Sequence, residues 1–154
     1  MEARCIQHQR VFTTTRSQRR RISLDVTWPF FTHCHPLGYQ SADALAMIVA
    51  FILQGFAIDE SVSRVIAFLL EKGCKEMVDC LQNAVNNAAK GPEYPNALSF
   101  LGQGWVGEEA VAIAVWAALV CPKDLKGAVV RAVNHSGDSD STGAVCGYIV
   151  GAAL

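Results

Sequence analysis

The chain has 154 residues, of which 51% are hydrophobic and 18% charged, so it has room for one globular domain with a sizeable core. Its net charge of −1 argues against a broadly basic nucleic-acid-binding domain. The six cysteines form no Cys-x-x-Cys pair, which favours reduced thiols in a cytoplasmic protein over a disulfide framework.

Residues 1–30 differ in composition from the rest of the chain. They contain six arginines against Glu2 and Asp25, a balance of +4 that leaves −5 for the remainder. Because this segment is polar and lacks a helical period, we expect an arm that is disordered or loosely attached. A nucleic-acid or targeting patch at residues 16–21 is the alternative to a solvated tail, and we expect no nucleic-acid partner.

Residues 32–40 predict a loop that leads into a helix. Pro36 disfavours helical backbone at His35, and Ser41 suits the N-cap of a helix that runs to Gly55. The apolar run 44–58 is shorter than the roughly 20 residues of a membrane span, so we expect a buried helix and no membrane.

Two histidines stand in this loop, at His33 and His35. In extended backbone, residues two apart point the same way, so the pair can bind a transition metal or contact a substrate. The alternative is a pair of loop histidines that hydrogen-bond to the backbone.

Helices are expected over 59–72 and 74–90, followed by a long loop up to residue 107. The glycines of this loop precede another helix and can offer N–H groups to an anion, although Glu108 and Glu109 would compete for them. Trp105 can stack on a flat ring, or it can cover the core.

Two further helices are expected over 107–121 and 123–134, and a last one is expected to begin near Ser141 or Thr142. The last helix carries glycines at 143, 147 and 151, a spacing that favours close approach to a neighbouring helix. The chain has no alternating strand pattern of useful length, so an all-α fold is predicted.

The loop between the last two helices is acidic and rich in hydroxyl groups. Asp138 and Asp140 stand beside the hydroxyls of Ser139, Ser141 and Thr142, and neighbouring carboxylates favour a hard divalent ion with oxygen ligands.

This acidic loop has two alternatives to a divalent-ion site. An EF-hand fits its first positions but fails at the twelfth, where Ile149 replaces the bidentate glutamate. A plain helix cap by Asp140 or Ser141, with no ion, stays open as the other alternative.

Three motifs in order make the chain from about residue 32 to 154 resemble the ADP-ribosylglycohydrolase family. They are Thr-His-Cys-His-Pro at 32–36 with the helix that follows it, Gly-Gln-Gly-Trp-Val-Gly-Glu-Glu-Ala at 102–110, and Asn-His-Ser-Gly-Asp-Ser-Asp-Ser-Thr-Gly at 134–143. The resemblance implies an orthogonally packed all-α fold with a pair of Mg²⁺ or Mn²⁺ ions in a cleft that binds ADP-ribose. The implied reaction removes ADP-ribose from a modified protein or small molecule.

The same resemblance implies roles for particular residues. Asp138, Asp140 and the hydroxyl of Ser141 match metal ligands of the family. The substrate cleft would include His33, Gln103, Gly104 and Trp105, with Trp105 stacked on adenine. A carboxylate would act as general acid or base, but no position is assigned to it.

The chain departs from the family pattern in one respect. Family members are considerably longer, and their first half supplies a Gly-Asp motif, a Thr-Asp-Asp triplet with further metal ligands, and a Gly-Asn-Gly loop. These motifs do not occur here, so we expect the C-terminal part of the fold with an incomplete ligand set. Either a partner supplies the missing half, or the chain is an inactive remnant that binds ADP-ribose or another protein.

Overall fold

The computed structural model describes residues 10–11, 22–23, 35–91 and 97–154. Residues 35–91 and 97–154 are built from helices, which confirms the all-α prediction. The helices are α2 (Pro36–Leu53), α3 (Ile58–Glu71), α4 (Lys75–Ala88), η1 (Ala97–Phe100), α5 (Gly107–Val120), α6 (Leu125–Val133) and α7 (Ser139–Ala153). The described part of the predicted arm is a short antiparallel pair, β1 (Arg10–Val11) with β2 (Ile22–Ser23). The rest of the arm and His33 lie outside the described residues.

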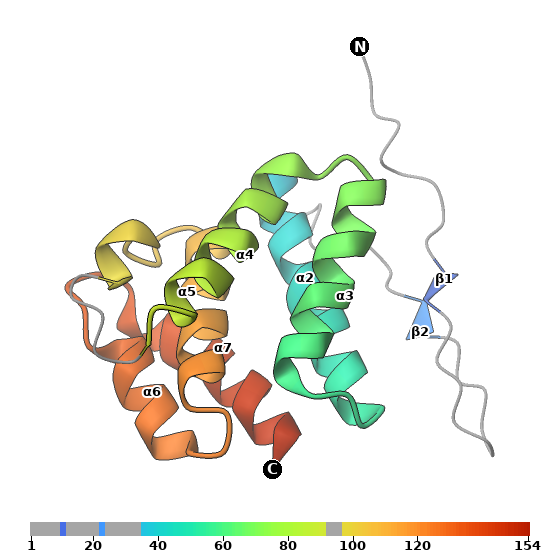
Figure 1. The fold of residues 1–154 in the computed structure, drawn as a ribbon. Coiled ribbons are helices and arrows are strands. Elements are labelled where there is room, and N and C mark those ends of the chain that lie inside the picture. The colour runs from blue at the N-terminus through green and yellow to red at the C-terminus, as the bar shows by residue number, and fades with distance from the viewer. Residues whose placement is uncertain (1–9, 12–21, 24–34, 92–96) are drawn as a thin grey trace.

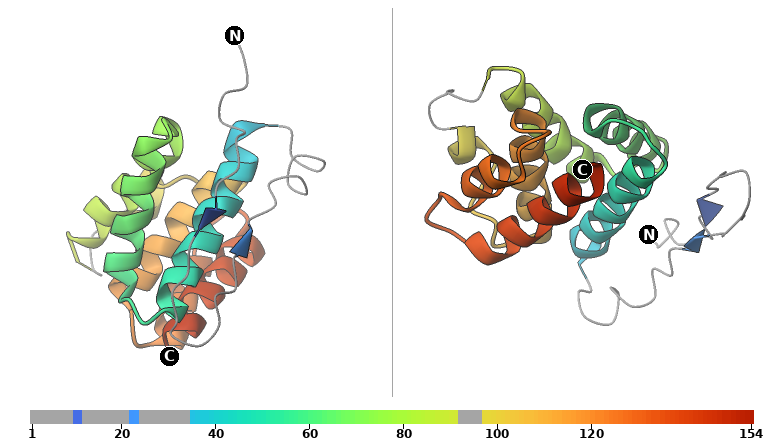
Figure 2. Two further views of the ribbon diagram at one scale, coloured as in Figure 1. Left: turned by 90° about the vertical axis from the view of Figure 1, so that its right-hand side faces the viewer. Right: turned by 90° about the horizontal axis from the view of Figure 1, so that it is seen from below.

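Helix α5 forms the centre of the core. Its sequence is apolar on every side, and each side chain from Ala110 to Ala118 is buried. It packs against α4, α7, α2 and α6. Figures 1 and 2 show α2 and α3 side by side in one part of the molecule and α6 in the other, with α7 between α6 and α2.

Helices α3 and α4 are amphipathic, as their patterns predict. Each buries one face, which includes Val62, Val65 and Leu69 in α3 and Met77 and Leu81 in α4. The turn after α3 places Gly73 at φ +75, a backbone conformation that favours glycine. The sequence therefore predicts both the faces and the ends of this helix pair closely.

Helix α2 begins earlier than predicted, at Pro36. His35 is its N-cap, with extended backbone and Nδ1 accepting a hydrogen bond from the N–H of Leu37 at 3.4 Å. Proline suits the first helical position because its fixed φ is already helical and its missing N–H is not needed there. The predicted cap at Ser41 is wrong, since Ser41 lies inside the helix and donates to the carbonyl of Gly38.

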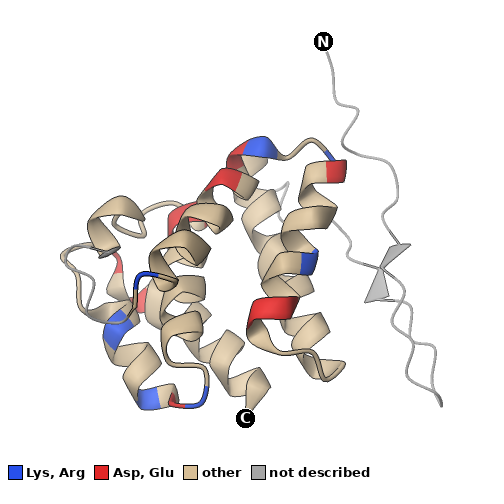
Figure 3. Ribbon diagram, viewed as in Figure 1, with Lys and Arg blue, Asp and Glu red and all other residues tan. Residues whose placement is uncertain are grey.

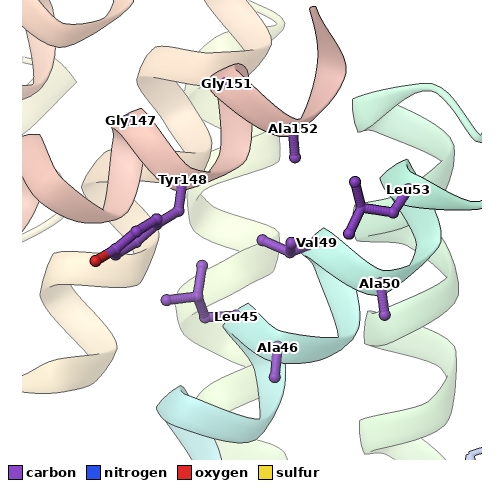
Figure 4. A pocket seen from close by; sticks show the side chains of 9 residues that line it. All are labelled: Leu45, Ala46, Val49, Ala50, Leu53, Gly147, Tyr148, Gly151 and Ala152. Atoms are coloured by element: carbon purple, nitrogen blue, oxygen red, sulfur yellow. The ribbon is translucent and has the colours of Figure 1, made fainter. Parts of the chain in front are cut away.

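Helix α2 is also less buried than predicted. By length and composition alone its 18 residues could cross a membrane, and 28% of them are buried. One face packs on the core, while another forms an apolar groove with α7 (Figure 4). This α2–α7 groove is lined by Leu45, Ala46, Val49, Ala50, Leu53, Gly147, Tyr148, Gly151 and Ala152.

The three spaced glycines of α7 differ in how closely a neighbouring helix approaches them. A Cβ on Gly143 would lie 2.7 Å from Val133 Cγ1, so the prediction of close helix approach is confirmed there. Nothing lies within 4 Å of a Cβ built on Gly147 or Gly151, so the prediction is wrong for these two. The ribbons of α2 and α7 also carry few charged residues (Figure 3).

Candidate functional site

The acidic residues gather at the N-terminus of α7. The helix begins at Ser139, earlier than predicted, because Asp138 acts as its N-cap: Asp138 Oδ1 accepts a hydrogen bond from the N–H of Ser141 at 3.3 Å. The cap predicted at Asp140 or Ser141 is therefore formed by Asp138 instead. The unpaired N–H groups of a helix start favour negative charge, so carboxylates are stabilised at this position.

The side chains of Asp138, Asp140 and Ser141 form one cluster, called here the acidic cluster. A hydrogen bond from the carboxyl group of Asp140 is the main cause that lowers the pKa of Asp138, followed by bonds from the hydroxyl and N–H of Ser141. Burial opposes this shift by raising the pKa of Asp138, and the electrostatic effect of the neighbouring His135 lowers it by the smallest contribution. Two carboxyl groups this close hold either a proton or a cation between them.

The acidic cluster fits part of the coordination shell of a hard cation. Carboxylate and hydroxyl oxygens are the donors that Mg²⁺ and Mn²⁺ prefer, and the three side chains are partly or fully exposed to solvent. Mg²⁺ takes six ligands, and no group of three or more His, Cys, Asp or Glu side chains suited to a metal occurs in the described ranges. Water or other groups would have to complete the shell.

Hydrogen bonds of His135 and Thr142 hold the backbone of the acidic loop in place. His135 Nδ1 accepts the N–H of Gly137 at 3.1 Å, and its Nε2 lies 3.0 Å from Thr142 Oγ1. The buried hydroxyl of Thr142 donates to the carbonyl of Ala132 at 2.8 Å, so it accepts from the imidazole Nε2–H. No role for His135 is predicted from the sequence; the available signal is its position seven residues before Thr142, which is buried.

The loop before α5 lies directly against the acidic loop. The N–H of Asp138 donates to the carbonyl of Gln103 at 2.9 Å. A Cβ on Gly137 would overlap that carbonyl oxygen, and a Cβ on Gly104, at φ +79, would lie 2.7 Å from Thr142 Cγ2. Glycine at both positions therefore permits the contact that brings Gln103 and Gly104 beside Asp138.

Trp105 projects from the same loop into solvent. Its side chain is 67% exposed, and its Nε1–H donates to Gln103 Oε1 at 3.0 Å. The alternative that Trp105 covers the core is wrong. An exposed ring held by one hydrogen bond offers a face for stacking, and that role stays a prediction.

Two backbone donors of this loop are already occupied by a glutamate side chain. The N–H groups of Gln103 and Gly104 both donate to Glu109 Oε2, each at 3.0 Å. The predicted competition of an acidic side chain for these donors is therefore confirmed for Glu109.

The other predicted groups lie apart from the cluster or outside the described residues. His33 lies outside them, and His35 is exposed at the start of α2. The α2–α7 groove contains none of the predicted site residues, and Gly147 lies roughly 12 Å along the α7 axis from Ser139, at about 1.5 Å per residue.

Comparison with known proteins agrees with the sequence motifs. A family model described as ADP-ribosylglycohydrolase matches residues 30–154. No match was found among curated proteins or among solved structures. The family match confirms the resemblance drawn from the three motifs.

Proposed function

Because the chain belongs to the ADP-ribosylglycohydrolase family, we propose that it takes part in hydrolysis of the glycosidic bond between ADP-ribose and a protein or small-molecule acceptor. At the family level it is a glycohydrolase-type protein. The observation that supports the specific proposal is the acidic cluster at the start of α7, with the loop of Gln103 and Trp105 hydrogen-bonded beside it.

In this proposal Asp138, Asp140 and Ser141 hold Mg²⁺ or Mn²⁺. Such a cation, when bound, would polarise ribose hydroxyls and lower the pKa of a water molecule. The chain itself contributes carboxylate oxygens at the start of α7. The N-cap hydrogen bond of Asp138 and the hydrogen bond that His135 accepts from Gly137 fix the backbone around these oxygens. Rigid ligands of this kind reduce the entropy lost when a substrate is oriented.

The loop before α5 supplies the proposed substrate contacts. Trp105 presents an exposed ring for the adenine, and the side chain of Gln103 limits rotation of that ring through its bond to the indole N–H. Gly104 belongs to this proposed substrate-binding loop, and its missing side chain lets the loop lie directly against Thr142. The ligand contacted there would be ADP-ribose, free or attached to its acceptor.

A second candidate function is binding of ADP-ribose without hydrolysis. It is favoured by the small number of ligands, since the described residues supply only part of a cation shell. A partner polypeptide that supplies more ligands would restore the first function. Hydrolysis and binding without hydrolysis would use the same residues and the same ligand position. They differ only in whether ADP-ribose is released from its acceptor.

The proposal is tested by release of ADP-ribose from an ADP-ribosylated protein, with Mg²⁺ or Mn²⁺ present and after chelation. Asp140→Asn is the informative variant because Asp140 does not cap α7, and Asp79→Asn on the exposed face of α4 is the control. Loss of metal-dependent release by about tenfold or more in D140N alone supports the proposal. Metal-dependent release that D140N leaves intact overturns it, and calorimetric binding without release supports the second candidate.

A further inference from the structure

We infer that Glu109 is a positioning residue for the acidic cluster. Its carboxylate accepts hydrogen bonds from the backbone N–H groups of Gln103 and Gly104. These bonds fix the Gln103 carbonyl, which accepts the N–H of Asp138. The consequence for metal affinity depends on the proposed function, whereas the consequence for the loop does not.

The carboxylate of Glu109 sits in a concave turn of backbone donors. One oxygen, Oε2, accepts two consecutive N–H groups at 3.0 Å each, an arrangement that binds anions. Hydrogen bonds to an ionised acceptor are roughly twice as strong as neutral ones. Its position in the first turn of α5 adds the favourable field of the helix start.

The turn is shaped closely around this side chain. Gly102 has φ +96, and a Cβ there would lie 2.5 Å from Glu109 Oε1 and would overlap the carboxyl carbon. A residue other than glycine at 102 would therefore displace the carboxylate as well as strain the backbone. The 102–104 turn and the Glu109 side chain therefore depend on each other for their conformation.

The peptide groups of Gln103 connect Glu109 to the acidic cluster. The N–H of Gln103 points to Glu109, its carbonyl receives the N–H of Asp138, and its side chain holds the indole of Trp105. Fixing the N–H of Gln103 restricts the orientation of the whole residue. Glu109 therefore acts on Asp138 through the backbone and on Trp105 through the Gln103 side chain.

The same contact restricts where a substrate anion can bind. With Glu109 in place, the N–H groups of Gln103 and Gly104 are not available to a diphosphate. The partly buried Glu108 lies next to Glu109 and adds negative charge at the same helix start. A phosphate group of the substrate is therefore expected to bind elsewhere than in this turn.

The test measures amide hydrogen exchange at Gln103, Gly104 and Asp138 by NMR in the wild-type chain and four variants. Glu109→Ala removes the acceptor, Glu109→Asp shortens its reach, and Glu109→Gln keeps a neutral oxygen at the same reach. Glu108→Ala is the matched control, because it removes the same charge from the same helix turn. Glu108 makes no hydrogen bond to the loop among the described residues.

We expect exchange at all three amides to rise by about tenfold in E109A, to rise less in E109D and least in E109Q, and to stay near wild type in E108A. Unchanged protection of Asp138 in E109A would overturn the inference. An equal rise at the buried amides of α5 would overturn it too, since it would show global destabilisation. Should E109A fail to fold, faster exchange in E109D than in E109Q supports the inference, and equal exchange in the two variants overturns it.

A second measurement follows Mn²⁺ binding by calorimetry in the same variants. Affinity that is reduced in E109A and E109D, and retained in E108A, supports transmission from Glu109 to the acidic cluster. Affinity that is equal in all five proteins overturns that transmission. If the wild-type chain binds no Mn²⁺, the proposed function fails, and the exchange data still decide the role of Glu109.

Discussion

The backbone N–H of Asp138 donates to the carbonyl oxygen of Gln103 across 2.9 Å, although the two residues belong to loops far apart in the chain. This single bond joins the acidic cluster to the loop that carries Trp105. Two of the three motifs that define the family match therefore meet at one place. The arrangement explains why a carboxylate pair, an exposed indole and several glycines occur in one small domain.

Asp138 has two separable roles, as helix cap and as proposed cation ligand. Asp138→Ala removes the acceptor of the Ser141 N–H and should lower the free energy of unfolding. Asp138→Asn keeps a capping oxygen, so its free energy of unfolding should stay close to that of wild type. Urea denaturation measures both, and equal stability of D138A and wild type would contradict the cap.

The glycines of the acidic loop and of α7 differ in the space around them. Gly137→Ala places a methyl group on the Gln103 carbonyl and should lower the free energy of unfolding by about 1–3 kcal/mol. Gly147→Ala meets nothing within 4 Å and lies inside a helix, so it should raise that energy by up to about 1 kcal/mol. Urea denaturation of the pair checks this, and a stable G137A would show that the two loops are not in tight contact.

Asp43 should make stability depend on pH. Burial raises its pKa from 3.8 to about 6. The folded state thus holds the proton more tightly than the unfolded state, so the stability it contributes is present below pH 4 and is lost as pH rises through 6. Its partial exposure screens the effect, which we place at about 1 kcal/mol.

The Asp43 effect is measured by comparing Asp43→Asn with wild type in urea at pH 4 and pH 8. The neutral amide introduced in D43N does not titrate, so this variant should not share the loss of stability as pH rises. The free energy of unfolding of D43N relative to wild type should therefore be higher at pH 8 than at pH 4. Asp79→Asn, a change at an exposed carboxylate, should keep the wild-type drop. A difference between D43N and wild type that is the same at both pH values would be inconsistent with the raised pKa.

Cys146 should resist alkylation in the folded protein. Burial, with a smaller effect of Cys121, raises the pKa of its thiol to about 11, so at pH 8 about one molecule in a thousand carries the thiolate. Iodoacetamide followed by peptide mass spectrometry should leave Cys146 unmodified in the native chain and label it fully in urea. Rapid native labelling of Cys146 would mean that α7 opens readily.

Features set by local chemistry were predictable from the sequence. The uniform apolarity of residues 110–118 predicts a buried helix, and the periodic apolar residues of 59–72 predict one buried face. The start of α2 was missed, because proline at the first helical position competes with a serine that also suits a cap. Both residues are common at helix starts, so the sequence alone does not decide between them.

Features that depend on tertiary contacts were only partly predictable. The sequence predicts a cation site at the two aspartates, which stays a prediction, but the contact of Gly137 with Gln103 requires two separate loops to meet. The role of His135 likewise depends on the position of Thr142 one helix turn into α7. The open face beside Gly147 was missed because a glycine spacing gives the same pattern whether a neighbour is present or not.

The most direct test of the account is calorimetric titration of Mn²⁺ into the wild-type chain and into Asp138→Asn and Asp140→Asn. The account predicts saturable binding to the wild-type chain, weakened by about tenfold or more in each variant while both stay folded. Binding of equal strength in all three proteins, or no binding to the wild-type chain, would contradict the claim that these aspartates hold a cation.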